Sequence, residues 1–168
     1  MTYIKDKEYK RIIKNILRNN DFKKLYNIEH HGISRWEHLV KVSYHSYNIA
    51  KKLNFDYKSV ARGALLHDFY LDGNERTGRK KFLDTFSHPK KALNTASTVF
   101  KINDMEKNII ISHMFPFYVA LPKYKESVLV DLVDKVIGGY ELINEYRYKF
   151  NYKFNYLYLL FVFFMTSK

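Results

Sequence analysis

The chain has 168 residues, 46% of them hydrophobic and 27% charged, with no cysteine and a formal net charge of +12. This composition excludes an intrinsically disordered chain, disulfide bonds, thiolate chemistry and cysteine-ligated zinc sites. The length suits one domain, and the absence of cysteine fits a reducing compartment, so we expect a single-domain cytoplasmic protein spanning 1–168. Any metal ion would be held by histidine nitrogens and carboxylate oxygens.

The positive charge is spread along the whole chain and does not form one block. Lysine, asparagine, tyrosine, isoleucine and phenylalanine are abundant together, which is typical of an AT-rich genome and raises the lysine content whatever the function. We therefore expect a solvated basic surface, with attraction of a phosphorylated substrate as the next interpretation. Dedicated binding of nucleic acid is not predicted.

Apolar residues recur at helical spacing along nearly the whole chain, and no hairpin signal separates two alternating apolar runs. The fold class is therefore predicted to be all-α. Capping boxes at Ser34–Glu37 and Asn103–Glu106 and the pair His88–Pro89 indicate helix starts. The predicted helices span residues 4–18, 21–30, 34–53, 56–68, 88–100, 103–113 and 124–148. Residues 69–87 are expected to form a loop, with a short helix inside it as the alternative.

The two ends of the chain predict neither a signal peptide nor a membrane span. The N-terminus is charged throughout and has no apolar core of a signal sequence. Near the C-terminus the run YLYLLFVFFM is apolar, but it is shorter than the roughly 18 residues that a spanning helix needs. We expect the segment 150–168 to pack on the core; a homodimer contact and a contact with a membrane surface are the alternatives.

The pair His67-Asp68 is the first candidate for chemistry. It ends an apolar helix, ARGALLHD, where two ionisable groups are costly to bury unless they are hydrogen-bonded, paired or bound to a metal. Taken alone, the pair fits a solvated helix end equally well. Asp131 and Asp134 strengthen the metal interpretation, because both lie on one face of the apolar stretch VLVDLVDKVIG and buried carboxylates need a cation.

Three stretches, EHLVKVSYHSYNIAKKL, VARGALLHDF and VLVDLVDKV, together resemble the HD-domain superfamily of metal-dependent phosphohydrolases. The resemblance implies a helical bundle of the HD type with its metal-site core over residues 34–140, preceded by N-terminal helices over residues 4–30. It favours Asp134 over Asp131 as the last ligand, because Asp134 precedes a basic residue within an apolar helix. The order of candidate ligands is most similar to that of small bacterial dinuclear HD hydrolases acting on nucleotides: His38, His67, Asp68, His88, His113 and Asp134.

This resemblance implies two divalent metal ions, with iron or manganese expected and zinc, cobalt, nickel or magnesium as alternatives. Asp68 would bridge the ions, one of them held also by His38, His67 and Asp134 and the other by His88 and His113. A shared, activated water would then attack phosphorus, with His67 and Asp68 at the catalytic centre. The predicted reaction is hydrolysis of a phosphate ester or anhydride in a small phosphorylated substrate, most simply a nucleotide.

The resemblance leaves the substrate contacts and the type of reaction open. Phosphatase branches of the family often carry a lysine shortly after the HD pair, whereas this chain has HDFYLDG. A substrate phosphate would instead be neutralised by one of the nearby basic residues, each of which also fits a plain surface charge: Arg62, Arg76, Arg79, Lys80, Lys81, Lys90 and Lys91. The alternative functions are a di-iron oxygenase of the HD type and a non-catalytic nucleotide-binding module. His45 is either a packing residue or a partner that orients a ligand.

Overall fold

The computed structural model describes the backbone of residues 5–30, 32–71 and 79–166, and the side chains in these ranges except those of residues 79–86 and 153–166. The elements follow in chain order: α1 (Lys7–Arg18), α2 (Asn20–Lys23), η2 (Lys24–Asn27), β1 (Glu29–His30), β2 (Ile33–Ser34), α3 (Arg35–Lys52), α4 (Tyr57–Leu66), α5 (Arg79–Val99), α6 (Asp104–Ser112) and α7 (Lys125–Thr166). The only strands among the described residues form one short antiparallel hairpin. The predicted all-α class is confirmed.

The helices begin where side chains cap them. Ser34 Oγ accepts a hydrogen bond from the backbone N–H of Glu37 at the start of α3 (3.2 Å). At the start of α6, Asn103 and Glu106 each accept a hydrogen bond from the other's backbone N–H, which is the predicted capping box. Asp56 caps α4 by accepting hydrogen bonds from the backbone N–H groups of Lys58 and Ser59. These caps set the first residue of the helices that carry the candidate ligands.

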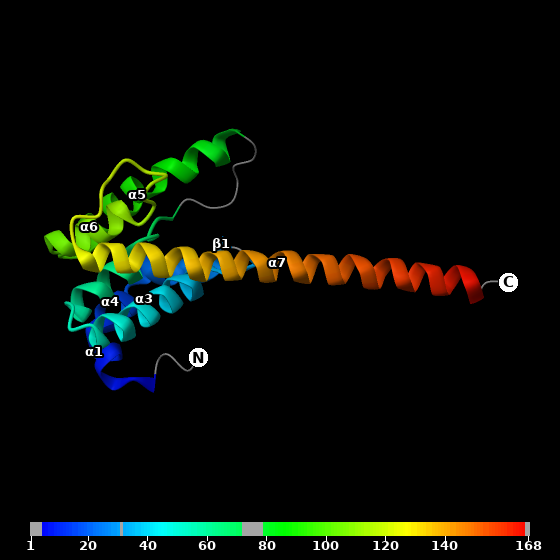
Figure 1. Cartoon of the computed structure of the whole chain (residues 1–168), viewed down its shortest axis with the longest axis horizontal. Helices are drawn as coiled ribbons and strands as arrows, with labels where there is room; N and C mark the ends of the chain where they lie inside the picture. The colour runs from blue at the N-terminus through cyan, green and yellow to red at the C-terminus, as the bar shows by residue number, and fades with distance from the viewer. Residues whose placement is uncertain (1–4, 31, 72–78, 167–168) are drawn as a thin grey trace.

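The antiparallel pair α3 and α4 forms the centre of the fold, with α1, α6 and α7 packed around it (Figure 1). The larger core cluster joins α1, α3 and α4 around Tyr9, Leu39 and Leu65. A second cluster joins α3, α4, α6 and α7 around Val42, Ile109 and Val130. Because α7 crosses this second cluster, it is held against the helices that end in His67 and His113.

Two predicted boundaries in the first half of the chain are wrong. The helix expected over residues 21–30 ends earlier, because α2 and η2 are followed by the hairpin, whose two-residue strands are too short to show a period. The turn of this hairpin contains Gly32 at a φ of 79°, a conformation that glycine adopts without strain. In addition, α5 begins at Arg79 and not at His88, so that Pro89 lies inside the helix and part of the expected loop is helical.

The C-terminal segment also differs from the prediction of a segment packed on the core. After Gly139 the chain contains neither glycine nor proline, so nothing ends α7, and it continues beyond residue 148 to Thr166. Figure 1 shows its C-terminal half extending away from the other helices, and Phe150 and Tyr152 are exposed. The side chains from residue 153 onward lie outside the description. Within the described residues, no helix has both the length and the hydropathy needed to cross a membrane.

Candidate metal centre

The six predicted ligands come from five helical segments and meet in one place. His38 lies in the first turn of α3, His67 and Asp68 follow α4, and Asp134 lies on α7. His88 lies on α5, and His113 follows α6. All are buried except Asp134, which is partly buried. The structure therefore brings all six predicted residues together.

His67 and His113 occupy equivalent positions, each directly after the last residue of its helix. Each ring lies 2.7 Å, through Nδ1, from a carbonyl oxygen three residues earlier, that of Ala64 or that of Ile110. A carbonyl can only accept, so Nδ1 carries the proton in both rings. This contact satisfies a carbonyl at the helix end and turns Nε2 of each ring toward the centre of the site.

One half of the site, which we call the His38 half, consists of His38, His67 and Asp134. One carboxylate oxygen, Asp134 Oδ1, lies 3.0 Å from His38 Nε2 and 3.3 Å from His67 Nε2. One ligand atom from each of the three residues lies within 4.8 Å of the others, so the group could hold a metal ion.

The other half, which we call the His88 half, consists of Asp68, His88 and His113. His88 Nε2 and His113 Nε2 are 2.9 Å apart, and Asp68 Oδ1 lies 3.2 Å and 3.4 Å from them. His67, Asp68 and His113 form a second group that could hold an ion, so His67 belongs to both groups. His67 and Asp68 thus lie at the junction of the two halves.

Two buried atoms at this junction test whether the residues fit a metal ion. His67 Nε2 and Asp68 Oδ1 are shielded from solvent, and although charged neighbours lie 3.2–3.4 Å away, neither atom makes a hydrogen bond of good geometry among the described residues. A buried acceptor without a partner is costly, and a bound cation removes this cost for both atoms. The nitrogen and oxygen donor set also suits a divalent transition metal. The residues therefore fit the group that the sequence predicts.

The charges of the site shift its pKa values strongly. Burial disfavours the ionised form of Asp68, but the neighbouring His88 and His113 more than offset it, so the pKa lies well below the usual value. The pKa of Asp134 is lowered in the same way, against burial, by His67 and His38. Conversely, Asp134 and Glu141 outweigh burial at His38 and raise its pKa to about 10. Both carboxylates are therefore charged and available as ligands near neutral pH.

Glu141 is a site residue that the sequence interpretation missed. It is 4% exposed, and its Oε2 accepts the Nδ1–H of His38 at 2.7 Å. Its other oxygen accepts a hydrogen bond from Lys41 at 3.2 Å. A carboxylate behind a histidine fixes the ring and directs the opposite nitrogen at a metal ion. The spacing offered a signal, because Glu141 lies seven residues, about two turns, after Asp134 on the same face of α7.

The other aspartate of α7, Asp131, and the basic residues proposed to bind phosphate are paired with other groups, lie on the surface or fall outside the described residues. Asp131 forms an ion pair with Lys135, one turn later on the same helix. Arg62 donates to Glu106 (2.6 Å) and to the carbonyl of Lys101, so its guanidinium joins α4 to the start of α6. Lys90 is exposed and Lys91 is partly buried, whereas Arg76 and the side chains of Arg79, Lys80 and Lys81 lie outside the described residues.

Arg35 is a second site residue that the sequence interpretation missed. It lies inside the predicted capping box Ser34–Glu37, and nothing in that motif indicates a role for its side chain. It is buried, donates from Nη1 to the carbonyl of Tyr70 (2.7 Å) and lies 3.9 Å above the Tyr70 ring. The Tyr70 ring in turn lies 5.8 Å from that of His88. Arg35 Nε has no hydrogen-bond partner among the described residues. A buried positive charge with an unused donor therefore lies beside the His88 half.

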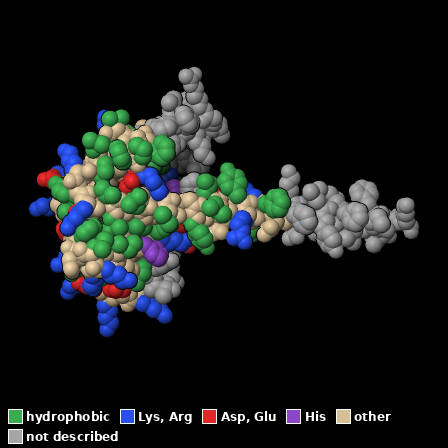
Figure 2. All heavy atoms as spheres, viewed as in Figure 1, with side chains coloured by type: hydrophobic (Ala, Val, Ile, Leu, Met, Phe, Trp, Pro, Cys, Tyr) green, Lys and Arg blue, Asp and Glu red, His purple; other side chains and the backbone are tan. Residues whose placement is uncertain are grey.

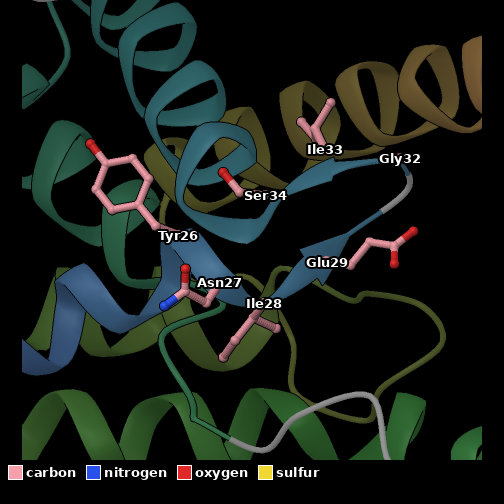
Figure 3. A pocket seen from close by; sticks show the side chains of 7 residues that line it. All are labelled: Tyr26, Asn27, Ile28, Glu29, Gly32, Ile33 and Ser34. Carbon is pink, nitrogen blue, oxygen red and sulfur yellow. The ribbon is translucent and has the colours of Figure 1, made fainter.

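The hairpin borders the other side of the site. The ring of His30 lies 4.4 Å from that of His38, and the Gly32 turn lies against Glu145 of α7. An open hollow of about 290 Å³ beside the hairpin is lined by residues 26–29 and 32–34 (Figure 3). None of these is a predicted ligand, so the hollow is separate from the metal centre. His45, further along α3, is exposed.

The sequence was compared with protein families, curated proteins and solved structures, and the family match covers the candidate metal ligands. The profile of the HD domain matches residues 35–138, more than half of the chain. This range contains all six predicted ligands and ends three residues before Glu141. No curated protein and no solved structure gives a significant match. HD domains are in general metal-dependent phosphohydrolases. The chain belongs to the HD domain family.

Proposed function

We propose that this chain hydrolyses a phosphate ester or anhydride bond in a small phosphorylated molecule, specifically a nucleotide, with two divalent metal ions. The observation that carries the proposal is the junction of the two halves, where His67 Nε2 and Asp68 Oδ1 are buried without a hydrogen-bond partner among the described residues. Such a pair of unused acceptors supports a cation site more directly than it supports a structural contact.

In this proposal His38, His67 and Asp134 hold one ion, His88 and His113 hold the other, and Asp68 contributes to both. Bound ions, iron or manganese in our proposal, supply Lewis acidity that acidifies water and neutralises phosphoryl oxygens. The chain's own contribution is to present ionised carboxylates and imidazole rings held in a fixed orientation. The hydrogen bonds from His67 and His113 to backbone carbonyls orient these two rings, and His38, whose pKa is raised to about 10, would release its Nε2 proton when an ion binds.

Arg35 is our candidate for contacting a phosphate group of the substrate. It is buried beside Tyr70, and its Nε is an unused donor among the described residues. A guanidinium binds phosphate oxygens in a forked geometry that lysine cannot reproduce. The lysine that phosphatase branches carry after the HD pair is missing here, so a cation from another segment must take its role. Arg35 meets that need better than Arg62, which is paired with Glu106.

The proposal is tested by loading the purified chain with Mn²⁺ or Fe²⁺ and measuring phosphate release from an aryl phosphate and a panel of nucleotides. We expect turnover with at least one nucleotide, and loss of turnover in Asp68→Asn. Nucleotide binding without turnover would instead identify a binding module. Oxygen consumption by the reduced iron form without phosphate release would identify an oxygenase. Either of these two results overturns the proposal.

Arg35 has a separate test. Arg35→Ala should raise KM for the phosphorylated substrate by roughly 10- to 100-fold, the value of a hydrogen bond to a charged group, with a smaller change in kcat. Arg35→Lys should recover part of this loss, because the charge remains and the fork is lost. Lys52→Ala, which removes an exposed charge at the opposite end of α3, is the control and should leave KM unchanged. Equal KM values for Arg35→Ala and the wild type would exclude this role.

A further inference from the structure

Helix α7 has two faces with different character. Asp134 and Glu141 lie on the face that packs against the other helices. The opposite face carries seven apolar side chains spaced three or four residues apart, each between 42% and 72% exposed: Val128, Leu132, Val136, Tyr140, Ile143, Tyr146 and Phe150. Figure 2 shows hydrophobic side chains along this part of α7. We call these seven residues the α7 stripe.

The α7 stripe is large enough for a stable interface. It runs about 33 Å along the helix at 1.5 Å per residue. Each side chain exposes on the order of 100 Å² of apolar surface, which gives about 700 Å² per copy. Two such surfaces would bury about 1,400 Å², within the range of about 1,200–2,000 Å² found for stable protein interfaces. Monomeric proteins rarely leave a continuous apolar surface of this size open to water.

Gly139 supplies a second observation at the middle of the stripe. A Cβ placed on Gly139 would meet nothing within 4 Å, so no contact within the described chain requires a glycine there. A glycine inside a helix costs about 1 kcal/mol relative to alanine. The absence of a side chain is useful where the backbone of another helix approaches closely. Gly139 lies midway between Val128 and Phe150, which is where a two-fold axis relating two copies of the stripe would lie.

We propose that the α7 stripe binds the same stripe of a second copy of this chain, antiparallel, with the two-fold axis at Gly139. This register places Val128 opposite Phe150 and Leu132 opposite Tyr146, so that small side chains meet large ones. With Gly139 in place of Tyr140, the positions from Leu132 to Phe150 alternate in steps of four and three, the spacing of helices that pair along their length. A two-fold contact uses one surface twice and needs no other partner.

The charges beside the stripe favour the antiparallel direction. Arg147 borders the stripe and is exposed. In a parallel pair in register, the two copies of Arg147 would lie side by side and repel each other. In the antiparallel pair they lie about 24 Å apart, since each is eight residues from the axis and the rise is 1.5 Å per residue. At that distance salt screens their repulsion.

The first experiment measures the mass of the full chain in solution by sedimentation equilibrium. We expect about twice the chain mass of 20.2 kDa. The double variant Val136→Glu with Ile143→Glu should raise the dissociation constant at least 100-fold, because it places charges in the stripe. Tyr148→Glu changes an exposed residue of α7 outside the stripe and should leave the dimer intact. A monomeric wild type, or a double variant that remains dimeric, would overturn the proposal.

The second experiment determines direction, and the lack of cysteine makes it unambiguous. Under mild oxidation, a mixture of the variants Leu132→Cys and Tyr146→Cys should form crosslinked dimers between the two variants. Leu132→Cys alone should form none, and a crosslink in that sample would indicate parallel pairing and reject our register.

A vesicle flotation assay with anionic lipid tests the alternative that a membrane surface, and not a second copy of the chain, covers the α7 stripe. Binding of monomers to vesicles through the stripe would reject a second copy as its partner. None of these results depends on the metal site.

Discussion

In the His38 half of the candidate centre, His38 contacts a carboxylate through each ring nitrogen, Asp134 on one side and Glu141 on the other. In the His88 half, the rings of His88 and His113 instead face each other across 2.9 Å with the single oxygen Asp68 Oδ1 beside them. The first arrangement has its counter-charges in place without an ion. The His88 half brings two potential metal ligands, the ring nitrogens of His88 and His113, close together with only one carboxylate beside them.

The two halves therefore differ in how far their geometry depends on a metal ion. The His38 half is held by hydrogen bonds between α3 and α7, so its geometry is organised before an ion binds. The His88 half brings together two imidazole nitrogens that cannot both be satisfied by each other if both are unprotonated. We therefore expect tighter metal binding in the His38 half than in the His88 half.

The largest effect is expected at the junction, where one residue serves both halves. Asp68→Asn keeps the size of the side chain but removes the negative charge next to His88 and His113. Both ions should bind more weakly, and activity should fall by about 10³-fold or more, because metal-assisted charge stabilisation is lost. Elemental analysis and phosphate release measure the two effects. Asp131→Asn is the matched control, since Asp131 pairs with Lys135 on the same helix as Asp134. Full activity in Asp68→Asn would disprove a shared role.

Removing one histidine from each half compares the halves directly. We expect His88→Ala to retain one tightly bound Mn²⁺ per chain, whereas His38→Ala should weaken the tighter site by more than 10-fold. The reason is that His38 is the residue through which Asp134 and Glu141 organise their half. Calorimetric titration with Mn²⁺ measures both affinities. His45→Ala, on the same helix but exposed, is the control. If His88→Ala abolished the tighter site, the proposed order of the halves would be reversed.

Residues at helix ends were the most predictable part of the site. His67 directly follows a helix whose apolar spacing is clear, and Asp134 interrupts an apolar face, so each stands out as a polar residue in an unfavourable place, whereas His113 was predicted from the resemblance to the HD family. The capping boxes likewise predicted the starts of α3 and α6 correctly. Periodicity and caps depend on neighbouring residues, which is why a single sequence reveals them.

Features that depend on distant contacts or on length were not predictable in the same way. Glu141 acquires its role only when α7 crosses α3, and Arg35 only when Tyr70 lies over its guanidinium. The strands of the hairpin are too short to show a period, and Pro89 indicates a helix start although α5 begins earlier, at Arg79. The continuation of α7 reflects the absence of any residue that would stop it.

A smaller effect is expected from the residue behind His38. Glu141→Gln keeps an acceptor for the His38 ring but removes the charge, and it should lower the affinity of the His38 half by about 10-fold, the lower end for residues that orient metal ligands. The His88 half should change little. Glu145→Gln is the control, because Glu145 lies four residues later and pairs with Lys149. Titration with Mn²⁺ distinguishes the two sites, and equal losses at both would show that Glu141 acts on the whole fold.

The smallest expected effect is on thermal stability, and it reports on both halves without requiring a substrate. Each ion bound to the folded chain stabilises it by about 3 kcal/mol at a concentration 100-fold above Kd, so chelation should lower Tm by roughly 6–12 °C for each ion removed. If the His38 half binds more tightly, His38→Ala should remove most of this chelator-induced shift, whereas His88→Ala should retain most of it. Thermal unfolding followed by circular dichroism, with and without chelator, gives the three shifts. Identical shifts in both variants would mean that the carboxylates around His38 give its half no advantage, and that the two rings facing each other in the His88 half bind an ion equally well.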